Sequence, residues 1–552
     1  MISNLCIKEK HIAQFKALYK KCIGLILIAL FANCDSFNEK TNDNPPSPPL
    51  ETIEVILNAQ TPYNGNAIQK ITFNAENSKR INIPNLQGHS VFFIKVNTSS
   101  QTIVHSSTGH AFNTNISTNL REVSDFPSVL NQNANIPRFR DHTLAQKFNA
   151  NPPNIPVLRK LSRNIQVSPI GIEKFFWVED VNDNFIQINT TLRAVSEHSA
   201  VWVAHESWND SDTKNENKVN QMQVIAFTEK FDRIYKLITP IFGKENGLNN
   251  DGKIHILVYD INPDRHNNET MIVGFFWSKD MMSQSAFDKA GVNIKSNEAE
   301  MFYMDSYILN MFPDLTYSTL AHEFQHLINY NENVIKRKQN PSVWYNEMLS
   351  MLAEDIISPL IDISENNPAH PISMRIPTFL EDYYLTGVAE WKSDPEFVLA
   401  SYSNIYAFGA YLARNYGGAE LIREIAQNNA IDVNSISNAL LKISGVDFKT
   451  AISRYGEALI YSGNHKPAGA NSFYNTVSQK IDMYEYTFNG FDIWSGRFKE
   501  QLKVWNLGWQ FTMPAYSIIV QSFDEWQAVN GSLDILVQKP SDPSIDVYIM
   551  VR

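Results

Sequence analysis

The sequence predicts an α+β protein with a central domain between two smaller β-domains. Short alternating runs of apolar residues, typical of strands, lie near both ends of the chain. The central part begins with similar runs and continues with long segments of helical periodicity. We therefore expect an N-terminal β-domain over 50–110, a linker or wrapping segment over 111–165, the central domain over 166–465 and a C-terminal β-module over 466–552.

The first 49 residues predict export rather than a folded domain. Five lysines and one glutamate precede an apolar run over 23–32, which is too short to span a bilayer comfortably and is typical of a signal peptide. Cys34 follows closely, and this position resembles a bacterial lipoprotein signal in which the cysteine becomes the lipidated first residue. Residues 31–33, Phe-Ala-Asn, depart from the usual pattern, so ordinary secretion is the alternative. We expect a signal peptide over 1–33 and a flexible, proline-rich tether over 34–49.

The cysteine count and the net charge limit the cellular compartments and the classes of binding partner that are expected. Of three cysteines, Cys6 and Cys22 would leave with the signal peptide, so no disulfide within the chain is expected. Removal of residues 1–33 would change the formal net charge from −11 to −15, because five lysines and one glutamate would be lost. An acidic chain without a basic cluster argues against nucleic acid and against electrostatic docking on anionic lipid. We expect a bacterial cell-envelope protein, held at the outer membrane or cell surface by its N-terminal lipid alone, or released.

Local patterns predict the elements along the chain. A helix is expected over 218–240, and the region after the central strands is expected to be mostly helical. Expected strands lie at 52–57, 81–83, 91–96, 175–178, 185–188, 201–203, 254–259, 516–520 and 547–551, and expected helices of the later region lie at 408–416 and 440–459.

Residues 322–326, His-Glu-Phe-Gln-His, are the most informative motif. Two histidines four apart share one face of a helix, so both ring nitrogens can bind one zinc ion. Glu323 between them is placed to take a proton from a zinc-bound water. Apolar residues at helical spacing around the motif predict that one face packs while the histidines face a cleft. The alternative is a surface helix with two ordinary histidines.

A second expected helix, residues 344–355, offers a third ligand. Asn346-Glu347 resembles the Asn-Glu signature with which gluzincin metallopeptidases supply a glutamate ligand. Two histidines and one glutamate leave the fourth zinc position open, which is typical of a catalytic site. One zinc ion per chain is therefore expected. The alternative for Glu347 is a solvated helix residue.

The run from Ser318 to Asp355 resembles the hyicolysin-type peptidases of family M30, and the resemblance extends over roughly residues 170–465. It implies a zincin domain of the gluzincin type with a helical C-terminal lobe. It also implies a zinc metalloendopeptidase with His322, His326 and Glu347 as ligands and Glu323 as the catalytic base.

Further candidates surround these residues. Glu354 lies seven residues after Glu347 on the same helix face and could orient a histidine ligand, or it could be a surface acid. Tyr402 and Tyr406 are candidate donors to the oxyanion of a tetrahedral intermediate, although aromatic residues at helical spacing are more often core. The strand over 301–305 is the expected edge to which a substrate peptide would add.

These observations predict a zinc-dependent metalloendopeptidase that hydrolyses peptide bonds of extracellular proteins by a zinc-activated water. Three alternatives remain open. A zinc aminopeptidase is one, although the chain lacks the Gly-x-Met-Glu-Asn segment with which a large aminopeptidase family holds the substrate amine. The others are a non-catalytic surface adhesin and a protein whose main reaction is its own processing.

Overall fold

The protein is described by a computed structural model. The predicted signal peptide, the tether and Cys34 lie outside the described residues. The described residues are 52–54, 68–84, 86, 89–105, 109–111, 117–119, 138–140, 142–158, 168–209, 215–249, 251–267, 270–463, 466, 469–498, 500–507, 511–522, 528–530 and 532–552.

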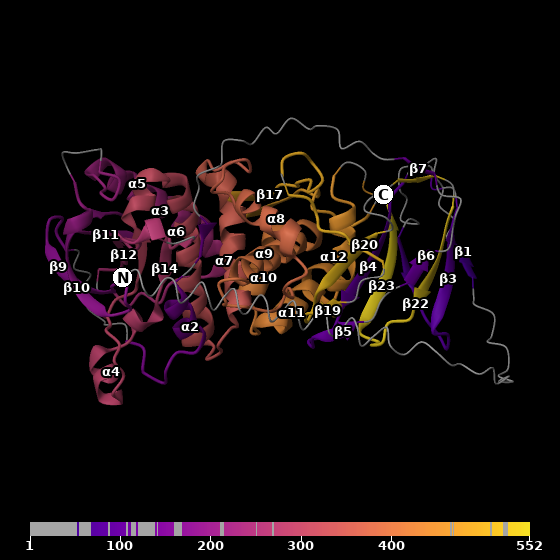
Figure 1. The fold of residues 1–552 in the computed structure, drawn as a ribbon. Helices are drawn as coiled ribbons and strands as arrows, with labels where there is room; N and C mark the ends of the chain where they lie inside the picture. Colours follow the sequence, from indigo (N-terminus) through magenta and orange to yellow (C-terminus); the bar gives the residue numbers. More distant parts are fainter. Residues whose placement is uncertain are drawn as a thin grey trace, which may run out of the picture. The chain divides into compact units, whose positions relative to one another are not determined.

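A mixed six-stranded sheet forms the first half of the central domain (Figure 1). The order is β14-β15-β12-β11-β10-β9, with β11, β12 and β15 parallel and the outer pairs antiparallel. The predicted strands of this region are confirmed, although β10 is much longer than expected. Their bounds are β9 (Glu173–Glu179), β10 (Phe185–Val195), β11 (Ser199–Ala204), β12 (Ile254–Tyr259), β14 (Gly274–Phe276) and β15 (Met301–Asp305).

Two long helices, α3 (Gln221–Phe242) and α6 (Pro313–Asn329), pack against this sheet and against each other. The Phe231 ring of α3 lies 5.8 Å from Phe302 of β15 and 5.3 Å from Phe324 of α6, so the three elements share one core. The shorter elements here are η1 (His205–Ser207), η2 (Arg265–Asn267), β13 (Thr270–Met271), η3 (Ser278–Met281), α4 (Gln284–Ala290) and α5 (Ser306–Met311).

The second half of the central domain is helical, as predicted. Gly409 lets α9 approach α7 closely, because a Cβ at this position would lie 2.9 Å from side-chain atoms of Met348 and Leu352. The expected helix over 440–459 is two helices, because Gly445 ends the first in a left-handed conformation. The bounds are η4 (Tyr330–Lys336), α7 (Val343–Ile357), η5 (Ser358–Ile361), α8 (Pro371–Asp382), α9 (Val398–Tyr416), α10 (Gly418–Gln427), α11 (Asp432–Ser444) and α12 (Phe448–Ile460).

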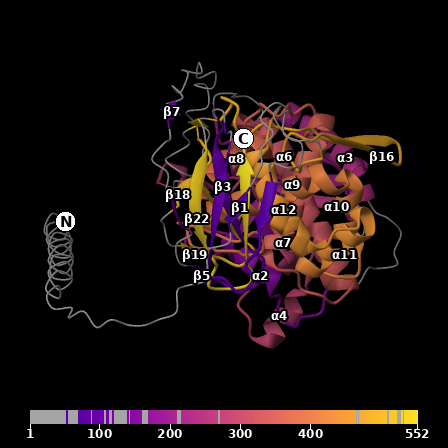
Figure 2. The same cartoon turned by 90° about the vertical axis from the view of Figure 1, so that its right-hand side faces the viewer.

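The two predicted β-domains are wrong as separate units. Figure 2 shows strands from both ends of the chain side by side, and β4 pairs with both β20 and β23, while β3 pairs with β22. Alternating apolar residues from both ends therefore share cores. The two sheets are β1-β3-β22-β6 and β18-β20-β4-β23-β2. Their bounds are β1 (Thr52–Glu54), β2 (Ile68–Ile71), β3 (Ser78–Ile83), β4 (Val91–Asn97), β6 (Gly109–Ala111), β18 (Trp505–Asn506), β20 (Ile518–Ser522), β22 (Leu533–Gln538) and β23 (Ile545–Val551).

Helix α12 joins this β-domain to the helical part. A Cβ at Gly456 of α12 would lie 2.6 Å from Ile94 of β4, so glycine permits this contact. The small two-stranded sheets are β5 (Ile103–His105) with β19 (Phe511–Met513), β7 (Ser117–Asn119) with β21 (Ala528–Asn530), and β16 (Val477–Ile481) with β17 (Tyr484–Phe488).

The predicted linker or wrapping segment includes regular structure against the central domain. Strand β8 (Arg138–Phe139) pairs with β13, and helix α2 (Thr143–Ala150) follows it. Phe139 and Ile155 are buried in the main core, and Ala145 is buried in a second core on the sheet. Residues 138–158 except 141 are therefore packed against the domain that they precede, whereas residues 117–119 of the same segment, strand β7, pair with β21 near the other end of the chain.

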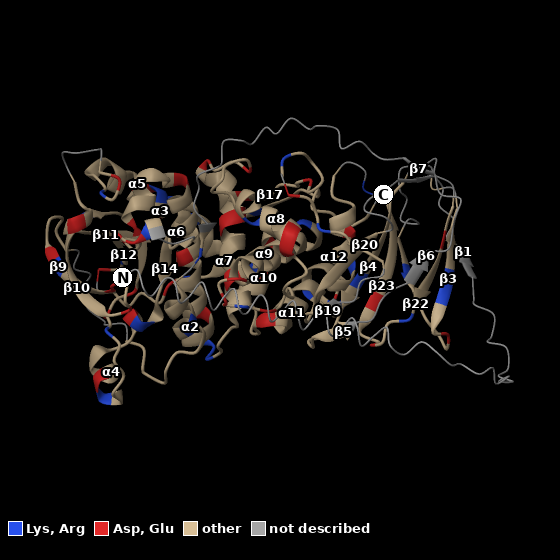
Figure 3. Ribbon diagram, viewed as in Figure 1, with Lys and Arg blue, Asp and Glu red and all other residues tan. Residues whose placement is uncertain are grey.

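Surface charge and helix length bear on the predicted partners. Figure 3 shows acidic and basic residues interspersed over the described helices and strands. Within the described ranges, no helix has both the length and the apolarity needed to cross a membrane. The exclusion of nucleic acid stays a prediction.

Candidate metal centre

Helix α6 carries the His-Glu-Phe-Gln-His motif, as the sequence predicts. Pro313 stands in the first turn, where its missing N–H costs nothing, and the helix continues through Asn329. His322 and His326 lie one turn apart with ring centroids 4.7 Å apart and ring planes at 85°. Both are buried, so the helix presents two imidazoles to the interior of the domain.

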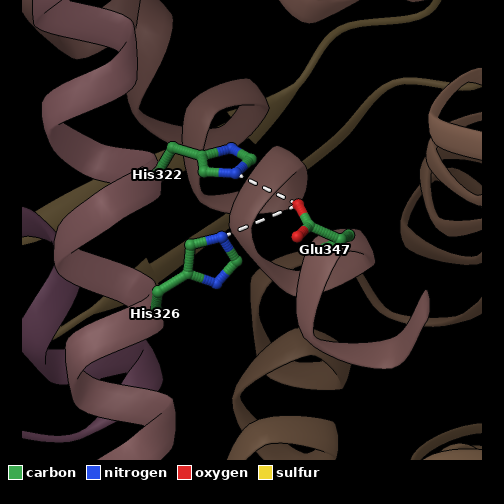
Figure 4. A group of neighbouring side chains, drawn as sticks. All are labelled: His322, His326 and Glu347. Atoms are coloured by element: carbon green, nitrogen blue, oxygen red, sulfur yellow. Dashed lines mark ion pairs between the residues drawn. The ribbon is translucent and has the colours of Figure 1, made fainter. Parts of the chain in front are cut away.

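Helix α7 brings Glu347 to the same point. Its Oε2 lies 3.2 Å from Nε2 of His322 and 3.6 Å from Nε2 of His326 (Figure 4). Glu347 is 1% exposed, so the alternative of a solvated helix residue is wrong. The three predicted ligands therefore converge, and they form a group that could hold a metal ion.

The distances from Glu347 to the two histidine nitrogens fit a tetrahedral zinc ion. With zinc–ligand distances of about 2.1 Å, neighbouring ligand atoms in a tetrahedron lie about 3.4 Å apart. The two distances from Oε2 of Glu347, 3.2 and 3.6 Å, bracket that value. Two nitrogens and one carboxylate oxygen are also ligand types that zinc accepts.

Hydrogen bonds on the other side of each ring set the tautomer that metal binding requires. Nδ1 of His322 lies 2.7 Å from Oε1 of Glu354, a carboxylate oxygen that can only accept. Ser318 donates to the other oxygen of Glu354 at 2.8 Å. Nδ1 of His322 must therefore carry the proton, which leaves the lone pair on Nε2. The surface-acid alternative for Glu354 is wrong, because this side chain is buried against His322.

Ser350 sets the second tautomer. Its hydroxyl donates to Oε1 of Gln325 at 2.5 Å, so it accepts from Nδ1–H of His326 at 3.0 Å. The lone pair of His326 is thus also on Nε2, which faces Glu347. Sequence reasoning assigned no role to Ser350, although it stands three residues after Glu347 on the same helix face.

Glu323 lines a cleft beside this centre. The cleft encloses about 510 Å³ of empty volume, part of it open to solvent. Burial raises the pKa of Tyr330 on its wall to about 12, so that phenol is neutral at ordinary pH. The cleft is lined by Glu323, His326 and Glu347 together with His142, Ala145, Gln146, Asn149, Ala150, Phe275, Phe276, Asn329, Tyr330, Val334, Pro341, Val343 and Asn346.

The edge strand at the cleft is β14, not the predicted strand over 301–305. That strand, β15, pairs with β12 on one side and with β14 on the other, so neither of its edges is open. The carbonyl of Val273 accepts from the N–H of Asp305, and strand alternation then directs the main chain of Gly274 away from β15. A Cβ at Gly274 would lie 3.3 Å from Cγ of Glu323, so this edge passes beside the predicted base.

The two candidate tyrosines lie in different surroundings. Tyr406 donates to Oδ2 of Asp355 at 3.0 Å, and burial raises the pKa of its hydroxyl well above the usual range. This hydroxyl is therefore hydrogen-bonded to the Asp355 carboxylate of α7 rather than free to face the predicted ligands. The Tyr402 hydroxyl accepts from Nε2 of Gln146 at 3.3 Å, and the same nitrogen donates to Oε1 of Glu347 at 2.6 Å. Of the two tyrosines, Tyr402 is the one linked through Gln146 to a predicted metal ligand, Glu347.

Gln146 was missed by sequence reasoning. It comes from α2, in the segment expected to be a linker or wrapping segment, and a lone glutamine in a polar stretch gives no local signal of a site.

Comparison with known protein families identifies the family to which this chain belongs. The family model of peptidase M30 matches residues 187–462, half of the chain, and this range contains both helices of the candidate metal centre. The chain belongs to the peptidase M30 family. The resemblance noted in the sequence is thereby confirmed.

A curated protein is also similar to this peptidase M30 chain. The neutral metalloprotease ShpI of Staphylococcus hyicus is 29% identical to it over an alignment of 282 positions, and the alignment covers 48% of this chain. The match spans 56% of the length of ShpI, so about half of that protein is represented.

Proposed function

We propose that the protein is a zinc-dependent metalloendopeptidase of the gluzincin type, with His322, His326 and Glu347 as ligands of one zinc ion and Glu323 as the base. The observation that carries this proposal is the convergence of both Nε2 atoms on Oε2 of Glu347, beside a cleft that Glu323 lines. Membership of a peptidase family and similarity to a metalloprotease support it.

A bound zinc ion would supply Lewis acidity toward the scissile carbonyl and would lower the pKa of water. Glu323 accepts a proton from the attacking water and delivers it to the leaving amine. Glu354 and Ser350 hold the two imidazoles with Nε2 toward the metal. Tyr402 remains the candidate donor to the oxyanion, since Tyr406 is engaged by Asp355.

The substrate main chain would lie in the cleft between β14 and α2, paired with the main chain of Gly274 by β-addition. This places an extended peptide beside Glu323. Since the cleft is partly open to solvent, it suits an internal stretch of a protein chain. A zinc aminopeptidase would need a group that holds the free substrate amine, and a non-catalytic adhesin would not need Glu323.

The variant Glu323→Gln tests the proposal. Glutamine is nearly isosteric and Glu323 is not a proposed ligand, so zinc content and stability should persist. Loss of a positioned general base should lower the rate of casein cleavage on the order of a hundred- to ten-thousand-fold. Asp314→Asn is the matched control, because Asp314 lies exposed on the same helix and its carboxylate accepts from Asn367.

Three outcomes separate the alternatives. Equal cleavage by wild type and Glu323→Gln at matched zinc content would reject the mechanism. Cleavage confined to the first residue of peptides would favour the aminopeptidase. If wild type and variant cleave nothing, themselves included, while both bind matrix proteins equally, the protein is an adhesin.

The proposed location is the bacterial cell envelope, with Cys34 as the lipidated residue and extracellular proteins as substrates. Support comes from the sequence pattern of residues 1–34. Cys34→Ser should abolish palmitate labelling and move the protein into soluble fractions. Unchanged labelling and partition would reject the anchor and leave the proposed chemistry intact.

A further inference from the structure

We propose that Gln146 is a positioning residue for the metal ligand Glu347, supplied by a helix that lies outside the part of the chain matched by the family model. The inference rests on the proposed function, because it assumes that His322, His326 and Glu347 bind zinc. It adds a side chain that neither the motif nor the family comparison assigns to this centre.

The contacts of Glu347 divide its two carboxylate oxygens. Oε2 faces Nε2 of both histidines, and Oε1 accepts from Nε2 of Gln146 at 2.6 Å. A carboxylate oxygen can only accept, so the amide nitrogen of Gln146 must face it. Holding Oε1 in this way fixes the rotation of the carboxylate and directs Oε2 toward the metal. Partners of this kind raise metal affinity because they preorganise the ligand.

Helix α2 is fixed to the sheet on both sides of Gln146. His142 caps the helix by accepting from the N–H of Ala145, and its ring lies 4.5 Å from that of Phe275. Its Nε2 lies 3.0 Å from Oε2 of the largely buried Glu179. These contacts attach the first turn of α2 to strands β9 and β14.

The last turn is attached by Asn149. Its amide donates to the carbonyl of Phe276 at 2.7 Å and accepts from the N–H of Ser278 at 2.8 Å. His142, Gln146 and Asn149 are spaced by four and three residues, so they share one face of the helix. The outer two bind the sheet edge, and the middle one reaches the metal ligand. Gln146 is therefore held in place before any metal binds.

Gln146 also connects the ligand to Tyr402. The same amide nitrogen lies 3.3 Å from the Tyr402 hydroxyl, and it can donate one hydrogen to each oxygen. The Tyr402 ring is packed edge-on against Trp391 at 4.7 Å, which limits its movement. Gln146 thus bridges a rigid hydroxyl on α9 and the ligand on α7.

The test is the zinc affinity of the full-length protein, measured by competition with a chelator. Gln146→Met keeps the volume and removes the donor, and Gln146→Ala removes both. We expect each to bind zinc roughly ten- to a hundredfold more weakly than wild type. With cobalt substituted for zinc, the visible absorption bands of both variants should shift. The control is Lys147→Met, on the exposed side of the same helix, with wild-type affinity and spectrum.

The thermal unfolding temperature of the metal-free protein separates positioning from packing. A purely structural role would lower that temperature in the Gln146 variants while leaving zinc affinity and the cobalt spectrum unchanged, and this result would overturn the inference. Faster cleavage by Gln146→Met at unchanged zinc affinity would also overturn it, because α2 would then obstruct the cleft. Failure of the wild type to bind zinc would instead reject the proposed function on which the inference rests.

Discussion

Glu354 and Asp355 follow one another on α7, yet their carboxylates contact different parts of the molecule. Glu354 accepts from His322 and Ser318 on the side of α7 that faces the metal centre. Asp355 pairs with Arg414 of α9 through two contacts of 2.9 and 3.1 Å and accepts from Tyr406. One helix therefore supports two buried polar networks on different faces.

The two networks differ in where the positive charge comes from. Asp355 has its counterion in the protein, because the Arg414 side chain is fully buried beside it. On the other face, Glu347 lies beside two imidazoles whose tautomers leave Nε2 unprotonated, a donor set that suits a divalent cation. Substitutions on the face of α7 that carries Asp355 should therefore lower the folding stability. Substitutions on the face that carries Glu347 and Glu354, the metal face, should lower the metal affinity.

Arg414→Met should produce the largest loss of stability. It would leave Asp355 buried without its counterion, which typically costs about 3–5 kcal/mol of unfolding free energy. Urea unfolding of the metal-free protein measures this. The control is Lys442→Met, because Lys442 of α11 pairs with Glu424 of α10 at the surface, where the two side chains are 64% and 22% exposed. Such a pair contributes about 0–1 kcal/mol. Equal losses of unfolding free energy in the two variants would show that the buried ion pair contributes no more to stability than a surface pair.

His370 should make stability depend on pH on the Asp355 side. Burial lowers the pKa of its imidazole from 6.5 to about 4, although Asp355 acts in the opposite direction. Because the unfolded state binds the proton more tightly, stability is complete above about pH 6.5 and falls as the pH decreases toward 4. The total loss is about 3 kcal/mol.

His370→Asn isolates this effect. The Nδ1 of His370 accepts from the N–H of Ile372 at the start of α8, and asparagine can accept at the same position. The variant should show a flatter decline of unfolding free energy between pH 6.5 and 4. If the unfolding free energies of variant and wild type fall equally between pH 6.5 and 4, another titrating group causes the loss of stability in acid.

Glu354→Gln should affect metal binding more than folding. Glutamine can still accept from Nδ1 of His322, but it removes the charge that makes the ring a stronger donor, so zinc affinity should fall by roughly tenfold or more. Asp355→Asn is the matched variant one residue away, and it should lower stability while the folded protein keeps its zinc affinity. Chelator competition and urea unfolding on both proteins give the comparison. A loss of zinc affinity in Asp355→Asn alone would reverse the assignment of the two faces.

The metal face was largely predictable, because its signals are local. His322 and His326 are four residues apart, and Glu347 with Glu354 follows the same helical periodicity, so short windows of sequence carry the pattern. Strand β12 was likewise predicted with its observed bounds, since only His255 interrupts its buried apolar run.

Non-local features could not be predicted in this way. The pairing of β4 with β20 and β23 joins opposite ends of the sequence, and apolar alternation does not specify which strands pair. Strand β14 has only three residues, too few for a periodic signal, so the edge was assigned to β15. Gln146 lies on an eight-residue helix in a polar segment, where its role depends entirely on tertiary contacts.

The smallest expected effect concerns Tyr406, which the sequence could not distinguish from Tyr402. Its hydroxyl donates to Asp355, which keeps both contacts with Arg414 when the hydroxyl is removed. Tyr406→Phe should therefore lower the unfolding free energy by about 1 kcal/mol. Peptide hydrolysis by the folded variant should stay close to that of wild type, because this hydroxyl lies behind α7 rather than at the metal face. Removal of an oxyanion donor costs on the order of a hundred- to a thousandfold in kcat. A loss of that size in Tyr406→Phe, with stability unchanged, would move the oxyanion donor to the Asp355 side and contradict the division of α7 into a metal face and a structural face.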